Sequence, residues 1–140
     1  MKHLLVAIDG SEPSRQAAVL AVGLAAKTDA AVTFAYCVVP VINTTEMVWV
    51  PTADFDEAQR RAGEQILAET KAQFSSARVK LDSRMLYGPA AERIAEEAKK
   101  GDYDLVVVGS RGHGAVKRLL LGSVTTRLLH ICEKTMLVVR

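Results

Sequence analysis

Few residues in this sequence are of the kinds that cross-link a chain, anchor it in a membrane or hold a metal ion. Only two cysteines occur among the 140 residues, Cys37 and Cys132, and they do not form a CxxC pair. We expect both to be buried free thiols, in agreement with a reducing, cytoplasmic location. The apolar run that follows Met1 is short, and no run approaches the roughly 18 residues of a membrane span, so we expect neither a signal peptide nor a membrane partner. His3 and His130 have no partners at ligand spacing, so we expect no metal bound by the protein itself.

Acidic residues are missing from one long segment of a chain whose formal net charge is only +2. No Asp or Glu occurs between residues 105 and 132, whereas the segment contains the basic residues Arg111, Lys117, Arg118 and Arg127. The small net charge gives no reason to expect a nucleic-acid partner. The acid-free segment is either a chance distribution on a mildly basic chain or a site for an anionic ligand. Composition alone does not separate these two interpretations.

Several well-known nucleotide and phosphate motifs are also missing. The sequence contains no GxxxxGK[ST], so the phosphate-binding lysine of a P-loop is lacking, and the turn at residues 9–14 has no GxGxxG. The third expected strand ends on Leu86-Tyr87-Gly88 and so offers no second acid for a phospho-acceptor site. Fast phosphoryl transfer also needs a metal, an oriented nucleophile and charge stabilisation together. We therefore expect binding chemistry, with slow hydrolysis at most.

Apolar runs and helical patterns alternate along the chain. Nearly every expected strand is apolar on both faces, which is typical of a parallel sheet covered on both sides. The sequence predicts an α/β fold, a Rossmann-like three-layer sandwich with a five-stranded parallel sheet and helices on both faces, in one domain over residues 1–140. The expected strands are residues 4–8, 31–39, 79–86, 105–108 and 136–139, and the expected helices begin at Ser11 or Glu12, at Thr52 or Asp54, after Gly88-Pro89 and at a capping Ser123. The expected inward-facing helix positions are Ala17, Leu20, Ala21, Leu24, Ala25, Ile66, Leu67, Phe74, Ile94, Ala95 and Ala98, and Gly101 is expected to end the third helix as a glycine cap.

Ligands of open parallel sheets bind beyond the carboxyl ends of the strands, where the strand order reverses. The first and fourth strands are expected at that point, and they end on Ala7-Ile8-Asp9 and Val108-Gly109. The fourth strand runs into a glycine-rich stretch, with glycines at 109, 112, 114 and 122. Glycines let backbone N–H groups approach phosphate oxygens, and the N-terminus of the last helix favours negative charge. The alternative is that these are ordinary turn glycines.

The spacing of Gly109, Gly112, Gly122 and Ser123 resembles the nucleotide-binding motif of the universal stress protein family, in its ATP-binding branch. The resemblance covers the whole chain, through the blocks KHLLVAIDGSEPS, VTFAYCVVP, YGPAAERIAEEAKKGDYDLVVVGSRGHG and LHICEKTMLVVR. It implies a sheet of the adenine-nucleotide alpha hydrolase type and a bound ATP, with Mg or Mn held through the phosphates. It also implies a role in the response to stress. The implied nucleoside contacts are Ala7, Ile8, Asp9, Cys37, Val108 and Gly109, and the implied phosphate contacts are Gly112, Gly122, Ser123, Val124 and Thr125.

The family resemblance further implies a homodimer, formed by antiparallel pairing of the last strand, Met136 to Val139. Two positions depart from the family pattern. Glu133-Lys134-Thr135 replaces a proline often found before the last strand, and Cys37 stands where valine is common. The alternatives to an ATP-binding regulatory protein are a dimeric interaction protein that does not depend on nucleotide and a slow ATPase.

Individual residues keep two interpretations at this point. Asp9 is either a nucleoside ligand or a turn and helix-capping residue. Arg111 and His113 either reach a terminal phosphate or are solvated, and Lys117 and Arg118 fit a solvated basic face. In the irregular segment from residue 41 to residue 51, Met47 and Trp49 fit a lid, a dimer contact or a satellite apolar cluster.

Overall fold

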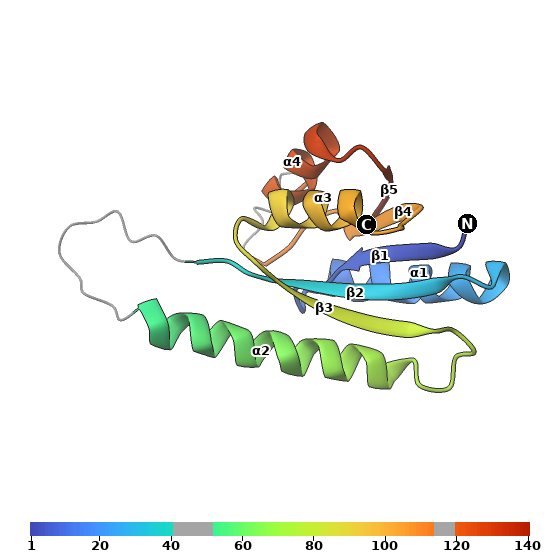
Figure 1. The fold of residues 1–140 in the computed structure, drawn as a ribbon, viewed down its shortest axis with the longest axis horizontal. Helices are drawn as coiled ribbons and strands as arrows, with labels where there is room; N and C mark the ends of the chain where they lie inside the picture. The colour runs from blue at the N-terminus through green and yellow to red at the C-terminus, as the bar shows by residue number, and fades with distance from the viewer. Residues whose placement is uncertain (41–51, 114–119) are drawn as a thin grey trace.

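The computed structural model describes residues 1–40, 52–113 and 120–140. The interpretations of Met47 and Trp49, and of Lys117 and Arg118, lie outside these residues. Within them, strands and helices alternate as the sequence predicts (Figure 1). The elements are β1 (His3–Ala7), α1 (Glu12–Thr28), β2 (Ala31–Val38), α2 (Thr52–Gln73), β3 (Leu81–Tyr87), α3 (Ala90–Lys100), β4 (Leu105–Gly109), α4 (Ser123–Ile131) and β5 (Thr135–Val139).

The five strands form one parallel sheet in the order β3-β2-β1-β4-β5. The chain therefore builds outward from β1 in one direction through β2 and β3, and then crosses back to add β4 and β5 on the other side. The strand order reverses between β1 and β4, which confirms the predicted switch point. In the register of that pair, Leu4 lies opposite Leu105 and Val6 opposite Val107.

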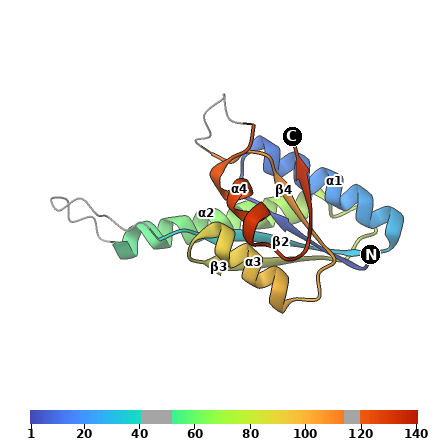
Figure 2. The same ribbon diagram turned by 90° about the horizontal axis from the view of Figure 1, so that it is seen from above.

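Each face of the sheet carries its own apolar core, which is why the strands are apolar on both faces. Leu4 and Val6 of β1 pack in the cluster that includes the α1 residues Ala17 and Ala21, whereas Leu5 belongs to the opposite cluster. Helices α1 and α2 cover the first face and α3 and α4 the second (Figures 1 and 2). The helices in the described residues all lack the combination of length and apolar content that would let one cross a bilayer.

The helix α1 begins at the predicted signals. Ser11 is its N-cap and accepts a hydrogen bond from the Ser14 backbone, and Pro13 lies in the first turn, where its missing N–H costs nothing. The prediction for Leu20 was wrong, because its side chain is 46% exposed while Ala17 and Ala21 are fully buried. With alanines packing closely on the sheet, the buried stripe of α1 is narrow, and Leu20 falls outside it.

Two predicted caps need correction. Gly101 follows α3, but its backbone is extended, with φ at −86°, rather than left-handed. A Cβ there would lie 2.1 Å from the Tyr103 ring, so close packing, not backbone conformation, requires glycine. The N-cap of α4 is Gly122, and Ser123, predicted as the cap, is the first helical residue.

Candidate functional site

A cavity of about 510 Å³ opens at the switch point, over the carboxyl ends of β1, β2 and β4 and beside the N-terminus of α4. The structure brings every predicted ligand contact into its wall. These residues are Ala7, Ile8, Asp9, Cys37, Val108, Gly109, Arg111, Gly112, Gly122, Ser123, Val124 and Thr125. Positions more than a hundred residues apart in sequence are therefore neighbours here.

The wall also contains residues that were not predicted: Ser14, Ala35, Tyr36, Val39, Gln59, Ala90 and Ile94. Those on β2 and just after it follow from the same rule that located Cys37, because they lie at the same edge of the sheet. Gln59 and Ile94 come from helices whose position over the sheet is set by packing, and no local sequence signal identifies them. His113, weighed above as a loop residue, lines the cavity as well.

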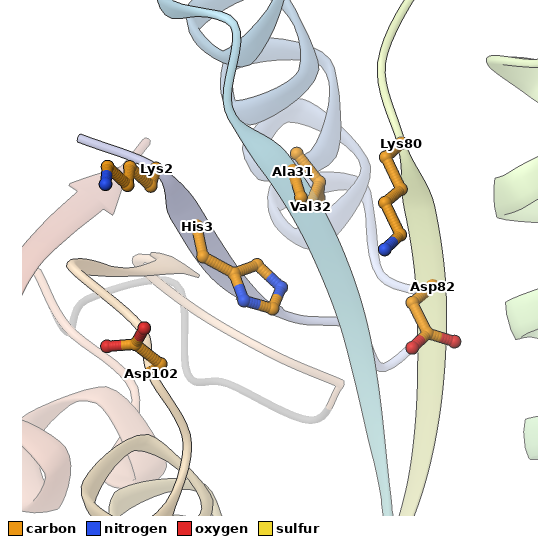
Figure 3. A pocket seen from close by; sticks show the side chains of 7 residues that line it. All are labelled: Lys2, His3, Ala31, Val32, Lys80, Asp82 and Asp102. Carbon is orange, nitrogen blue, oxygen red and sulfur yellow. The ribbon is translucent and has the colours of Figure 1, made fainter.

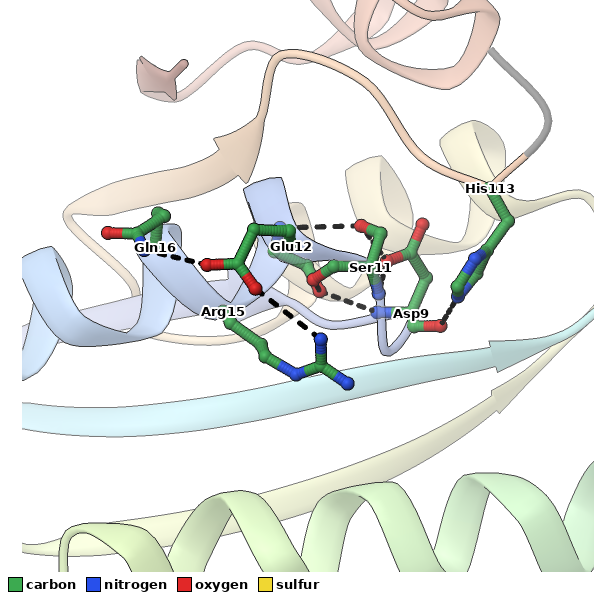
Figure 4. A network of polar contacts seen from close by, with 7 residues as sticks. Asp9, Ser11, Glu12, Arg15, Gln16 and His113 are labelled. Atoms are coloured by element: carbon green, nitrogen blue, oxygen red, sulfur yellow. Dashed lines mark hydrogen bonds and ion pairs between the residues drawn. The ribbon is translucent and has the colours of Figure 1, made fainter.

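The turn after β1 holds Asp9 in a fixed orientation (Figure 4). Its Oδ1 accepts hydrogen bonds from the Ser11 backbone N–H, at 2.9 Å, and from the Ser11 hydroxyl. Gly10 has a φ of +83°, a left-handed conformation that favours glycine at this position. The turn interpretation of Asp9 is thus confirmed for one carboxylate oxygen. Its other oxygen, Oδ2, faces the segment that follows β4, residues 110–113, which we call the glycine loop. An ideal Cβ on Gly112 would lie only 2.6 Å from that oxygen.

His113 connects the glycine loop after β4 to the turn that follows β1. Its Nε2 lies 2.7 Å from the carbonyl oxygen of Asp9, and because a carbonyl only accepts, this nitrogen carries the proton. The base of the loop is closed by two backbone hydrogen bonds of Ser110, which accepts from Gly122 and donates to Val139, both at 2.6 Å. The loop is therefore anchored at its base and at His113, with Arg111 exposed between them.

Two motif glycines have packing reasons of their own. A Cβ on Gly109 would lie 2.8 Å from both the carbonyl carbon and the Cβ of Pro13, so α1 crosses β4 too closely for any side chain. Among the described residues, a Cβ on Gly112 would meet the carboxylate of Asp9 across the cavity. The interpretation as structural glycines thus holds for Gly109, whereas Gly112 faces the cavity itself.

The N-terminus of α4 is the main source of hydrogen-bond donors in the wall. Its N-cap, Gly122, supplies no side-chain cap, and its first turn contains no acidic residue. The first N–H groups of a helix have no partner within the helix, and together with the helix dipole they favour an anion. The Thr125 hydroxyl, by contrast, donates to the carbonyl oxygen of Gly109 at 2.7 Å and fixes α4 to the end of β4.

The opposite part of the wall is uncharged and mostly apolar. Ile8, Ala35 and Val108 are buried there. Both cysteines are free thiols, as expected, but each is partly and not fully buried. For Cys37 this burial raises the pKa of the thiol to about 11, so the thiol stays protonated at neutral pH. Burial and the nearby charge of Asp9 also raise the pKa of Tyr36. The cavity therefore suits a ligand with one weakly polar end and one anionic end.

A second cavity, of about 270 Å³, lies at the opposite edge of the sheet (Figure 3). It is lined by Lys2, His3, Ala31, Val32, Lys80, Asp82 and Asp102. Its lysines and aspartates are exposed and of mixed sign. None of the predicted ligand contacts lies in it, and it faces the amino ends of the strands, where ligands of parallel sheets do not ordinarily bind.

Comparison with known proteins gives one consistent result. The model of the universal stress protein family matches residues 1–140. A universal stress protein of Methanocaldococcus jannaschii is 32% identical over 143 aligned residues, covering 99% of this chain and 82% of that protein. Universal stress protein YxiE of Bacillus subtilis is 33% identical, covering 98% of this chain and 97% of the relative.

Solved structures agree with the fold. Universal stress protein UspA from Lactobacillus plantarum superposes with a TM-score of 0.90 at 22% identity, covering 99% of this chain and 97% of the other. A universal stress protein in complex with cAMP has a TM-score of 0.75 at 25% identity, covering 99% and 97%. A family protein from Arabidopsis thaliana with AMP bound has a TM-score of 0.72 at 17% identity, covering 99% and 91%. With its parallel sheet, its glycine loop at the switch point and these whole-length matches, the chain belongs to the universal stress protein family.

Proposed function

We propose that the 510 Å³ cavity binds an adenine nucleotide, ATP or a close relative, and that the protein acts in the cytoplasm as a nucleotide-responsive regulator of the stress response. The observation that carries the proposal is the pairing of an apolar wall with the N-terminus of α4 in one cavity. That pairing complements a purine base at one end and phosphates at the other. The family members with cAMP and AMP bound support the same ligand class.

In this arrangement the base and ribose lie against the ends of β1 and β2, at Ala7, Ile8 and Cys37, with Val108 and Gly109 opposite. Asp9 Oδ2 is the oxygen available to a ribose hydroxyl, because Oδ1 is engaged by Ser11. The backbone N–H groups at Gly112, Ser123 and Val124 surround the phosphates, and Gly122 contributes through its lack of a side chain, because its N–H is already donated to Ser110. Thr125 contributes through its position and backbone, because its hydroxyl proton is already donated to Gly109.

Slow hydrolysis at most is expected from the same wall. Among the described residues lining the cavity, Asp9 is the carboxylate present, and one of its oxygens is committed to the turn. A divalent Mg or Mn would then be held mainly by the phosphates. Exposed Arg111 is placed to approach a terminal phosphate, which adds binding energy without supplying a base.

Thermal melts with ATP, ADP, AMP and cyclic AMP, each with and without magnesium, test the proposal. A ligand at a hundredfold excess over its Kd stabilises the folded state by about 2.7 kcal/mol. Gly122→Val should abolish the shift, because a side chain there would enter the loop against the Arg111 backbone. Gly23→Ala is the control, since among the described residues no atom outside the adjoining helix backbone lies within 4 Å of its added Cβ. Melts unmoved by every nucleotide would refute the proposal.

We also propose that the protein forms a homodimer through β5. This strand is at the edge of the sheet, and the helices on the two faces of the sheet carry exposed apolar side chains, Val19 and Leu20 on α1 and Leu129 on α4. Because Val139 accepts from Ser110, strand alternation turns the backbone groups of Val138 toward the free edge. A second copy of the chain is the partner that pairs most simply with such an edge. If nucleotides fail to bind, this surface supports the alternative of a nucleotide-independent interaction protein.

A further inference from the structure

The side chain of His113 joins the glycine loop to the turn after β1. Its Nε2 donates to the carbonyl oxygen of Asp9 at 2.7 Å, although the two residues are 104 positions apart in sequence. Figure 4 shows the imidazole ring reaching from the loop to that carbonyl group. The register of β1 with β4 ends with Val6 opposite Val107, so this hydrogen bond connects the two strands beyond the end of their ladder.

Asp9 has partners for three of its polar groups. Its N–H donates to the Ser14 hydroxyl at 3.4 Å, and its Oδ1 accepts from the backbone and the hydroxyl of Ser11. The His113 hydrogen bond fixes its carbonyl group. The remaining oxygen, Oδ2, faces Gly112, where an ideal Cβ would lie 2.6 Å away. The oxygen that Asp9 offers to a ligand is therefore held from both sides of the switch point, and His113 supplies the contact from the β4 side.

Packing also fixes the position of the imidazole ring. A Cβ on Gly10 would lie 3.5 Å from Nε2 of His113 and 3.0 Å from Cδ1 of Ile66 on α2. The ring therefore rests against the turn after β1, beside a helix that packs on the sheet. Gly112 precedes His113 in the chain and lines the cavity. The position of its backbone relative to Asp9 therefore depends on the hydrogen bond of its neighbour.

The proposed nucleotide spans the two segments that His113 joins. Its ribose lies at Asp9, after β1, and its phosphates lie at Gly112, after β4. A ligand made of two linked pieces binds more tightly than either piece alone, and the gain is largest when the protein holds the two subsites at the separation that the ligand requires. We propose that His113 is a positioning residue that fixes this separation, so that both ends of one nucleotide bind at once. This inference rests on the proposed nucleotide site, and His113 acts in it through Asp9 rather than by contact with a phosphate.

Titration calorimetry with ADP and with its two pieces, adenosine and pyrophosphate, tests this role. In His113→Ala, ADP should bind about three- to tenfold more weakly, the range expected for the loss of one net hydrogen bond. Adenosine and pyrophosphate should each lose less than about twofold in affinity, because neither piece spans both segments. ATP should lose as much as ADP, because its additional phosphate does not depend on the His113 hydrogen bond.

Conservative variants separate the hydrogen bond from the bulk of the side chain. Glutamine places an amide N–H about as far from the backbone as Nε2 of histidine, so His113→Gln should restore ADP affinity to within about twofold of the wild type. The shorter asparagine does not reach the Asp9 carbonyl, so His113→Asn should bind ADP as weakly as His113→Ala. His130→Ala is the control, because His130 is exposed on α4 and its Nδ1 donates to the carbonyl of Thr126 in the same helix. His113 is exposed too, so all these variants should melt near the wild-type temperature.

Other outcomes overturn the role of His113. A loss of adenosine or pyrophosphate binding as large as that of ADP would mean that His113 serves one end of the ligand and not both. A larger loss for ATP than for ADP would mean direct contact with the terminal phosphate. Failure of His113→Gln to restore binding, or equal recovery in His113→Asn, would exclude the hydrogen bond to Asp9 as the cause. ADP binding by the wild-type protein with no loss in His113→Ala refutes only the role of His113, whereas no ADP binding by the wild type refutes the proposed site as well.

Discussion

Gly109 and Gly112 belong to one motif, yet a side chain at each position would meet different neighbours. Substitutions at the two positions should therefore have different effects on stability and on ligand binding. In Gly109→Ala the new Cβ would lie 2.8 Å from both the carbonyl carbon and the Cβ of Pro13. These atoms belong to the first turn of α1, which packs on β4 and cannot rotate away. Relief requires a shift of the helix, and overpacking of this kind costs about 1–3 kcal/mol.

In Gly112→Ala the new Cβ would meet the Asp9 carboxylate, with Oδ2 at 2.6 Å, and no other side chain in the described part of the chain. Gly112 is exposed and can shift away from the carboxylate, so we expect a stability loss below about 0.5 kcal/mol. The methyl group would nevertheless occupy the cavity beside Asp9, so nucleotide affinity should fall about tenfold or more, equivalent to at least about 1.4 kcal/mol. Gly109→Ala should therefore reduce stability and Gly112→Ala should reduce binding.

Urea unfolding and AMP titration on the two variants measure these effects separately. Gly23→Ala provides the control, because it lies on α1 with open space around its Cβ and should be neutral or stabilise the fold by up to about 1 kcal/mol. A Gly109→Ala protein as stable as the wild type would refute the close approach of α1 to β4. A Gly112→Ala protein that binds AMP with unchanged affinity would remove Gly112 from the site.

Three further predictions concern Thr125, Cys37 and the β5 edge. Thr125→Val keeps the shape of a side chain that is 5% exposed, but it leaves the Gly109 carbonyl without its donor, so urea unfolding should show a stability loss of about 1–3 kcal/mol. The control, Thr126→Val at an exposed position, should lose less than about 0.5 kcal/mol. Equal losses would contradict the role of this hydrogen bond. Burial raises the pKa of Cys37 to about 11, so its alkylation at pH 8 should be about a hundredfold slower than that of an unfolded-chain thiol with a pKa near 8.5. The pKa of Cys37 is higher in the folded than in the unfolded chain, so its contribution to stability is complete below the unfolded pKa and is lost as the pH rises toward 11. Fast labelling at pH 8 would contradict the burial of the thiol. Val138→Pro removes an outward-facing N–H donor of the edge strand, so the variant should sediment as a monomer while its melting temperature stays near that of the wild type. Val138→Thr, the control, should stay dimeric. A dimeric proline variant would exclude pairing through β5.

The sequence was sufficient to predict the architecture and most of the cavity wall, for physical reasons that are visible in the structure. Strands that are apolar on both faces require cover on both faces, and the carboxyl-end rule then locates Asp9 and Gly109 without further knowledge. The tightly packed glycines were harder to interpret. Gly101 looked like a left-handed cap, but it is glycine because the Tyr103 ring occupies the space of a side chain.

Contacts that depend on helix placement could not be predicted in this way. The stripe of α1 that faces the sheet is narrow because alanines bring the helix close, and this left Leu20 at the surface. The hydrogen bonds between the Gln59 side chain and the Val39 backbone depend on where α2 crosses the end of β2. Periodicity defines the faces of a helix, but it does not define which residue of another element meets a given turn.

The most direct test of the central claim is to follow the backbone amide resonances of the protein by NMR as AMP is added. The proposed site predicts that the largest changes occur at the amides of Asp9, Cys37, Gly112 and residues 122–124, which line one cavity over the carboxyl ends of the strands. Absence of changes at saturating AMP would contradict nucleotide binding, and changes centred on His3, Val32 and Asp82 would place the ligand in the opposite cavity.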